Sequence, residues 1–166
     1  MRSKFLLAAA FLLSACAGSP DSRYYTLSPV TGQPSAKPAY RLAGLRLPTL
    51  YDRPQMATRN NANEVEFSEF ERWAEPLERM TARILALDIA ARHPQRTADA
   101  PKLTVNIDEF MADRSGQARL SGSWKLQNRE VPFSLSRPVS GQGSGQVAQA
   151  MSDLLGQLAD EIDRAS

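Results

Sequence analysis

The stretch LTVNIDEFMADRSGQARLSGSWKLQNREVPFSL, residues 103–135, sets the fold class. Apolar and polar residues alternate in three successive runs of this stretch, which are 103–107, 120–126 and 131–135. Alternation with a period of two is typical of strands that bury one face. Turn-forming residues separate the runs, including Asp113 and Gly116 at the first junction and Asn128 at the second. The stretch therefore predicts an antiparallel meander of three strands.

The first half of the chain contains three weaker strand candidates, which are residues 24–27, 40–47 and 64–70. The first and third contain several β-branched and aromatic residues, and the second is ended by Pro48, which cannot donate to a sheet ladder. The segment between the second and third candidates, 50–62, contains a proline and two adjacent asparagines. We therefore predict that residues 50–62 are mostly turn and loop.

An amphipathic helix is predicted to begin after Pro76, because proline suits the first helical turn, and to end at His93. Its apolar stripe recurs at steps of three and four and consists of Trp73, Leu77, Met80, Ile84, Leu87 and Ala91. The charged residues expected to lie off this stripe are Glu75, Glu78, Arg79, Arg83 and Arg92. A rival start at Ser68, with Glu71 completing a capping box, would put Pro76 inside the helix at a real cost.

A second helix is predicted after the glycine-rich run 140–145. Its apolar face consists of Val147, Met151, Leu154, Leu155, Leu158 and Ile162. The element order is then three strands, a helix, three strands and a helix. This order predicts an α+β fold, in which a mostly antiparallel sheet of about six strands packs two helices on one face.

The N-terminus has the order of a secretion signal. Arg2 and Lys4 precede an apolar run, residues 5–13, that is shorter than the roughly 20 apolar residues needed to cross a bilayer. The run leads into Leu13-Ser14-Ala15-Cys16, which fits the bacterial lipobox, where cleavage occurs just before a lipid-carrying cysteine. The alternative is an ordinary signal peptide with a chance cysteine. The predicted organisation is a lipoprotein signal peptide at 1–15, a lipid-anchored tether at 16–22 and a single periplasmic domain at 23–166.

The expected modification of Cys16 is covalent diacylglycerol and an N-acyl chain, and no other cofactor is expected. Two or three chains would hold the protein firmly, whereas one chain binds a membrane only marginally. Ala17 follows, where an aspartate usually retains lipoproteins at the inner membrane. We therefore predict the periplasmic face of the outer membrane, or the plasma membrane in a cell without an outer membrane.

Charge and cysteine content narrow the class of protein. The chain has 20 basic and 18 acidic side chains, and the signal removes two basic ones, so the mature chain is balanced. Such a balance argues against nucleic acid as the main partner. Cys16 is the only cysteine, so internal disulfides are excluded.

Several blocks of the chain resemble the ABC-type transport auxiliary lipoproteins, the family of PqiC-like, MCE-associated proteins. The blocks are the lipobox at Cys16, Tyr24-Tyr25-Thr26-Leu27, Leu47-Pro48 with Tyr51-Asp52-Arg53-Pro54-Gln55 and Arg59, Trp73-Ala74-Glu75-Pro76-Leu77, and Leu154-Leu155-Gly156-Gln157-Leu158-Ala159. One departure is Leu50-Tyr51, where relatives often have tyrosine followed by a leucine-like residue. The middle strands match in pattern alone.

The resemblance implies a non-catalytic periplasmic subunit, placed beside an ABC transporter and an MCE-type protein. Such systems move lipids or other hydrophobic solutes between the membranes, so we expect a role in docking the complex at the outer membrane and in membrane integrity. The candidate interface residues are Tyr24, Tyr25, Tyr51, Asp52, Arg53, Pro54, Gln55, Arg59 and Trp73. Simpler structural interpretations are a turn for 52–54, a core position for Trp73, and an outward side chain for one of the two adjacent tyrosines.

Two other classes stay open at this point. One is a structural or assembly-accessory envelope lipoprotein, which the sequence separates poorly from a transport subunit. The other, less favoured, is a lipid hydrolase, which would have to use His93, although no Gly-x-Ser-x-Gly motif is present. Asp108 and Glu109 could serve as acid and base, but solvated charges at a strand end are the simpler interpretation. An edge strand at 24–27 could also pair with a second copy and give a homo-oligomer.

Overall fold

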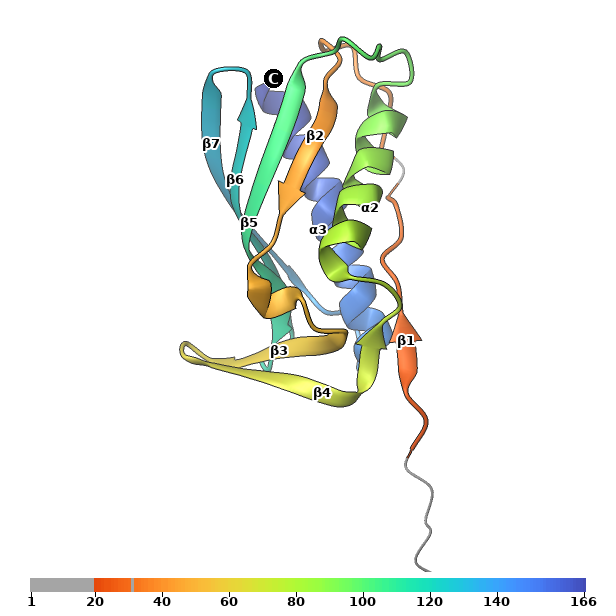
Figure 1. The fold of residues 1–166 in the computed structure, drawn as a ribbon, viewed down its shortest axis with the longest axis vertical. Coiled ribbons are helices and arrows are strands. Elements are labelled where there is room, and N and C mark those ends of the chain that lie inside the picture. The colour runs from red at the N-terminus through yellow and green to blue at the C-terminus, as the bar shows by residue number, and fades with distance from the viewer. Residues whose placement is uncertain (1–19, 31) are drawn as a thin grey trace, which may run out of the picture.

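The computed structural model describes residues 20–30 and 32–166, so the predicted signal peptide and Cys16 lie outside the described part of the chain. The described residues form seven strands in one sheet and two α-helices (Figure 1). The strands are β1 (Arg23–Tyr25), β2 (Arg41–Arg46), β3 (Gln55–Asn61), β4 (Glu64–Trp73), β5 (Lys102–Asp113), β6 (Gln117–Leu126) and β7 (Arg129–Pro138). The helices are α2 (Leu77–Arg92) and α3 (Ser144–Ala165), and a short 3-10 helix, η2, covers Thr49–Tyr51.

The predicted meander is confirmed, because β5, β6 and β7 pair antiparallel in succession. The α+β class is also confirmed. The sheet as a whole is mixed, however, and has one strand more than expected. Its order is β1-β4-β3-β5-β6-β7, with β2 also paired to β5. The β1–β4, β2–β5 and β3–β5 pairings are parallel. Local alternation in the sequence predicts strands but carries little information on the direction of pairing between distant segments.

β5 explains this mixed topology, because it is long enough to take two neighbours along one edge. Its first residues pair with β2 as far as Asn106, and its last two, Ala112 and Asp113, pair with β3. On that edge, residues 107–111 of β5 therefore lie in the gap between its pairing with β2 and its pairing with β3. A register shift against β6, between Ile107 and Glu109, marks the same region.

The prediction of turn and loop for 50–62 is wrong over most of its length. Residues 52–54 do form the expected turn, but β3 starts at Gln55 and forms a hairpin with β4. Pairing with β4 outweighs the weak strand propensity of Asn60 and Asn61, which lie at the end of the hairpin next to its turn. β4 also runs three residues beyond the predicted end of its strand, to Trp73.

The later start of the first helix is confirmed, since α2 begins at Leu77 directly after Pro76. Its apolar stripe differs from the prediction at Leu87, which is 46% exposed. The buried face instead continues through Leu85 and Ile89, and it includes Asp88 and Arg92, which the pattern of apolar residues could not reveal. Arg92 was expected to lie off the stripe and is buried.

The two helices lie side by side on one face of the sheet, as predicted (Figure 1). α3 packs on β5, β6 and β7, and α2 lies beside it against β2. The core between them contains Trp124 and Phe110 from the sheet and the predicted face of α3, in which Leu154 and Leu158 are fully buried. Within residues 20–30 and 32–166, no helix combines the length and apolar character needed to cross a membrane.

A strap, defined as residues 26–30 and 32–39, runs in extended form from β1 along the two helices to the opposite end of the domain (Figure 1). The Val30 amide donates to Asp88 Oδ1 at 2.7 Å, and the Ser35 amide donates to the carbonyl of Arg92 at 2.8 Å. Gly156 of α3 makes room for this strap, because a Cβ there would lie 2.8 Å from the Cβ of Val30. The strap thus closes the outer side of the helical layer.

Candidate functional site

Three blocks that are far apart in the sequence meet where β1, β4 and β3 lie next to one another. Arg72 of β4 pairs with Tyr24 of β1 on one side and with Gln55 of β3 on the other. Tyr25 pairs with Trp73, and the Trp73 amide donates to the carbonyl of Pro54 at 2.7 Å. We call this group the β1–β4–β3 corner: Tyr24, Tyr25, residues 52–55, Arg72 and Trp73.

Tyr51, the residue just before the turn at 52–54, anchors this turn to β5. Its side chain is 5% exposed, and its hydroxyl accepts a hydrogen bond from the Phe110 amide at 2.7 Å. That amide lies in the part of β5 between its pairings with β2 and β3, so the tyrosine satisfies a buried donor. Burial raises the pKa of Tyr51 to about 12, and the hydroxyl therefore stays neutral.

The turn itself is exposed but fixed in position. Asp52, Arg53 and Pro54 are all exposed, and the Arg53 guanidinium lies over the ring of Phe67 with its carbon 4.9 Å from the ring centre. Upstream, the Leu47 amide donates to Glu78 Oε2 of α2 at 2.9 Å. An exposed loop held by a rigid scaffold is well suited to contact a partner.

The candidate interface residues from the sequence differ in exposure and in their distance from the corner. Tyr24 is 64% exposed while Tyr25 is half-buried, as their alternation on a strand suggests. Tyr51 and Trp73 are each 5% exposed, so both are core residues with little surface to offer a partner. Arg59 lies away from the corner, toward the hairpin tip. Of the proposed interface residues, the accessible ones at the corner are Tyr24, Asp52, Arg53, Pro54 and Gln55.

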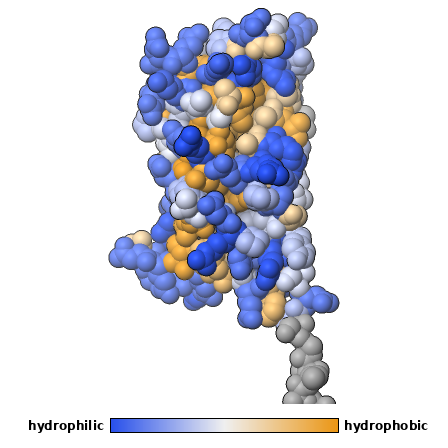
Figure 2. Space-filling view, in the orientation of Figure 1, coloured by the Kyte–Doolittle hydropathy of each residue, from blue (hydrophilic) through white to orange (hydrophobic). Residues whose placement is uncertain are grey.

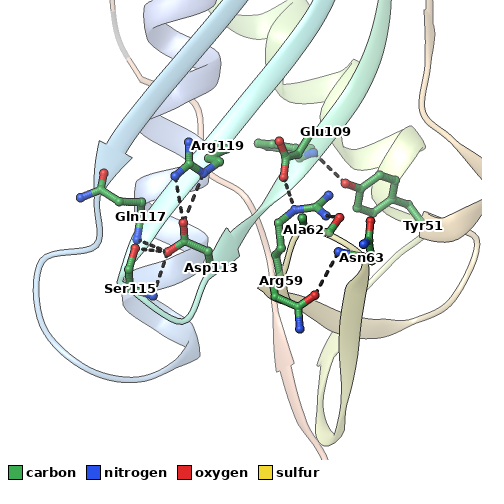
Figure 3. A network of polar contacts seen from close by, with 11 residues as sticks. Tyr51, Arg59, Ala62, Asn63, Glu109, Asp113, Ser115, Gln117 and Arg119 are labelled. Atoms are coloured by element: carbon green, nitrogen blue, oxygen red, sulfur yellow. Dashed lines mark hydrogen bonds and ion pairs between the residues drawn. The ribbon is translucent and has the colours of Figure 1, made fainter.

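A cleft of about 490 Å³ lies between the tip of the β3–β4 hairpin and the β5–β6 turn, and Figure 3 shows its polar contacts. Arg59 Nε contacts Glu109 Oε1 at 2.6 Å. Asp113 accepts from the amides of Ser115 and Gln117 at 2.9 and 3.0 Å through one oxygen, and from Arg119 through the other. Burial acts to raise the pKa of Asp113, but the hydrogen bond from the Ser115 hydroxyl, together with those from the two amides and Arg119, outweighs it and holds that pKa below its ordinary value.

Arg114 links the two sides of the cleft. Its Nε donates to Asn60 Oδ1 and its Nη2 contacts Glu66 Oε2, both at 2.6 Å. The cleft therefore has three arginines, and each is paired with one carboxylate. Sequence reasoning points to Arg59 but not to Arg114 or Arg119, because a charged residue in a turn or on the exposed face of a strand looks like ordinary solvated surface.

The arrangement around His93 bears on the hydrolase alternative. Ser35 Oγ donates to Asp163 Oδ2 at 2.8 Å, and His93 Nε2 lies 3.1 Å from the other oxygen of the same carboxylate. The carboxylate thus lies between the serine and the imidazole. A catalytic triad needs the imidazole between the serine and the carboxylate, so that it can take the hydroxyl proton. In the described part of the chain, no group of three or more His, Cys, Asp or Glu side chains is arranged to hold a metal ion.

A polar network, buried at Asp88 and Arg92 and exposed at Asp160, joins the two helices beside His93. Arg92 Nη2 contacts Asp160 Oδ1 at 2.6 Å and also donates to the carbonyl of Gly156 at 3.1 Å. Asp88 is fully buried, and desolvation raises its pKa to about 6, although the hydrogen bond from the Val30 amide and the charge of Arg92 oppose this effect. The network fixes the strap, and its Asp160 side lies open to solvent along a cleft of about 500 Å³ beside the strap.

The fold and its corner define a small α+β domain with an exposed, rigidly held turn. The chain belongs to the ABC-type transport auxiliary lipoprotein component family, whose model matches residues 25–163. The family is an auxiliary component of ABC-type transport systems.

Solved structures share the fold. A crystal structure of an uncharacterized protein is 18% identical, with a TM-score of 0.74, and the match covers 88% of this chain and 99% of that one. A protein of family DUF330 from Xanthomonas campestris is 19% identical, with a TM-score of 0.62, over 84% of this chain and 92% of that one. No curated protein sequence matches the chain.

Proposed function

We propose that this protein is a non-catalytic, lipid-anchored subunit of an ABC/MCE-type system that moves lipid or another hydrophobic solute. In this proposal Cys16 carries diacylglycerol and an N-acyl chain, and the body lies on the periplasmic side of the outer membrane. There it docks an MCE-type protein and supports membrane integrity. Membership in the transport auxiliary family supports the system, and the lipobox supports the anchor.

The observation that carries the docking role is the β1–β4–β3 corner. Three of the blocks that resemble the family meet there, although at least 13 residues lie between each block and the next along the chain. At the corner, the ring of Tyr24 and the guanidinium of Arg53 are accessible to a partner. The buried side chains of Tyr51 and Trp73 lie beside them. Exposed aromatic and arginine side chains are the ones most enriched at protein interfaces.

A tether would strengthen such docking without any further contact. A domain confined to a membrane surface has a high effective concentration for a partner that reaches the same surface. The corner therefore needs only modest intrinsic affinity.

The test is affinity purification of the full-length lipidated protein from native membranes, with mass spectrometry of the partners and of the Cys16 peptide. We expect an MCE-type protein or ABC transporter subunits to co-purify, and acyl chains on Cys16. Arg53→Ala should lower partner recovery several-fold, whereas Lys125→Ala, an exposed cation on β6, should not. Recovery of other envelope machinery with an acylated Cys16 would instead support the accessory class.

A second measurement addresses the role in the cell. Deletion of the protein should increase envelope permeability under detergent stress and disturb lipid asymmetry. The wild-type gene and the Lys125→Ala variant should restore both, and Arg53→Ala should restore them incompletely. Unchanged permeability and asymmetry in the deletion strain would contradict the proposal.

A further inference from the structure

We propose that the end of the domain formed by the β3–β4 hairpin tip and the β5–β6 turn rests on the phospholipid headgroups of the anchoring membrane. The inference depends on the lipid anchor in the proposed function, and it adds an orientation and a second contact. The contacting surface is the arginine cleft, defined by Arg59, Arg114 and Arg119 with the neighbouring Asn60 and Asn61.

The length of chain after Cys16 limits how far this end can lie from the membrane. Four peptide steps join Cys16 to Pro20, the first described residue, and an extended chain spans at most about 14 Å over them. Residues 20–22 then lead directly into β1. In Figure 1 the chain reaches β1 at the same end of the long axis as the hairpin and the β5–β6 turn. The β6–β7 turn and the last residues of α3 lie at the opposite end.

The chemistry of this end suits headgroups better than hydrocarbon. Figure 2 shows that the tip of the hairpin is hydrophilic. The side chains of Arg114 and Arg119 are 65% and 46% exposed. A guanidinium has five N–H donors, and each of the three arginines uses only part of its set on the protein contacts given above. The remaining donors can bind phosphate oxygens in the geometry that makes arginine–phosphate pairs strong.

The charges around the cleft also indicate the kind of membrane surface. Each arginine is paired with a carboxylate, from Glu109, Glu66 or Asp113, so the cleft has no large excess of positive charge. Long-range attraction to an anionic surface is therefore weak, and contact relies on short-range hydrogen bonds. Zwitterionic headgroups, which place a phosphate beside an ammonium group, match this alternation of charges.

The single natural cysteine makes the orientation measurable. Once Cys16 is acylated, a cysteine introduced elsewhere is the only free thiol. The mature lipidated protein would be placed in phosphatidylethanolamine–phosphatidylglycerol vesicles as Ser115→Cys, Ala62→Cys or Asn128→Cys. Each would carry one maleimide fluorophore, and quenching by a headgroup-attached spin label would be compared. Ser115 and Ala62 flank the cleft, and Asn128 lies in the β6–β7 turn as the control.

We expect several-fold stronger headgroup quenching at Ser115→Cys and Ala62→Cys than at Asn128→Cys. Adding Arg114→Gln and Arg119→Gln should weaken quenching at Ser115→Cys. The matched double variant Arg46→Gln with Lys125→Gln, which removes two exposed cations elsewhere, should not. Circular dichroism checks that each variant is folded.

The outcomes separate this inference from the proposed function. Equal quenching at both ends with an acylated Cys16 would overturn the orientation and leave the anchor intact. Quenching at the hairpin end that ignores the two arginine substitutions would overturn the headgroup contact. An unmodified Cys16, seen in the mass of its peptide, would overturn the anchor and this inference together.

Discussion

The hydroxyl of Tyr51 accepts a hydrogen bond from the amide of Phe110, 2.7 Å away, where β5 changes partner from β2 to β3. This bond connects the exposed turn at 52–54 to the centre of the sheet. It also gives a structural reason for a tyrosine in a block that resembles the family, because the hydroxyl completes the hydrogen bonding of a strand at a gap in its pairing.

Tyr51→Phe should therefore destabilise the domain although it keeps the buried ring. The Phe110 amide would lose its acceptor in a site closed to water, which costs about 1–3 kcal/mol. The free energy of unfolding, measured with urea, checks this. Tyr24→Phe, which removes a hydroxyl from an exposed ring, is the control and should change little. Equal stability of Tyr51→Phe and the wild type would show that the amide finds another partner.

Gly156→Ala should destabilise the contact between α3 and the strap. The new Cβ would lie 2.8 Å from the Cβ of Val30, so the strap or the helix must move, and overpacking of this kind typically costs about 1–3 kcal/mol. Gly145→Ala in the same helix is the matched control, because its Cβ would meet only a Tyr25 ring atom at 3.9 Å. Gly145→Ala should be neutral or mildly stabilising in a urea titration. A stable Gly156→Ala domain would mean that the strap packs loosely.

Strong local signals made part of this structure predictable. Strict alternation over 103–135 fixed the meander, and Pro76 fixed the start of α2, because both depend on neighbouring residues alone. The prediction of a loop for 50–62 is wrong because β3 is stabilised by pairing with β4 and β5. The asparagines of this segment have a low strand propensity and give no sign of that pairing. The parallel pairings of β1 and β2 depend in the same way on segments 48 or more residues away.

The candidate site was predictable only in pieces. The resemblance supplied the blocks at Tyr24, Arg53 and Trp73, but their meeting at Arg72 follows from strand register and was not foreseen. Leu87 was misplaced because a stripe at steps of three and four fits two adjacent helical faces. The true face is completed by Asp88 and Arg92, whose burial is possible because the strap and Asp160 provide their partners.

Asp88→Asn should stabilise the domain at neutral pH. The pKa of Asp88 is raised from 3.8 to about 6 in the folded state, mainly by desolvation, so its ionised form opposes folding above pH 6. This penalty, about 2–3 kcal/mol at most, is relieved as the pH falls from about 6 toward 4.

Asparagine keeps an acceptor for the Val30 amide and has no charge. The stability difference between variant and wild type should therefore be largest at pH 7–8 and shrink below pH 5, as measured by urea unfolding across pH. A difference that is constant with pH would show that Asp88 does not titrate in this range.

Asp113→Ala should loosen the β5–β6 turn that forms one wall of the arginine cleft. The carboxylate accepts from the amides of Ser115 and Gln117 and from Arg119, so its removal leaves two turn amides without an acceptor and frees the guanidinium. We expect a loss of about 1–3 kcal/mol in unfolding free energy, since hydrogen bonds to a charged group are the stronger kind.

The pKa of Asp113 is held below its ordinary value, so the stability that this carboxylate contributes is present above about pH 4 and is lost as the pH falls through the lowered folded pKa. Asp108→Ala, an exposed carboxylate in the same strand, is the control and should have little effect. Hydrogen exchange at Ser115 and Gln117 should accelerate only in Asp113→Ala, and unchanged protection there would contradict the assigned role.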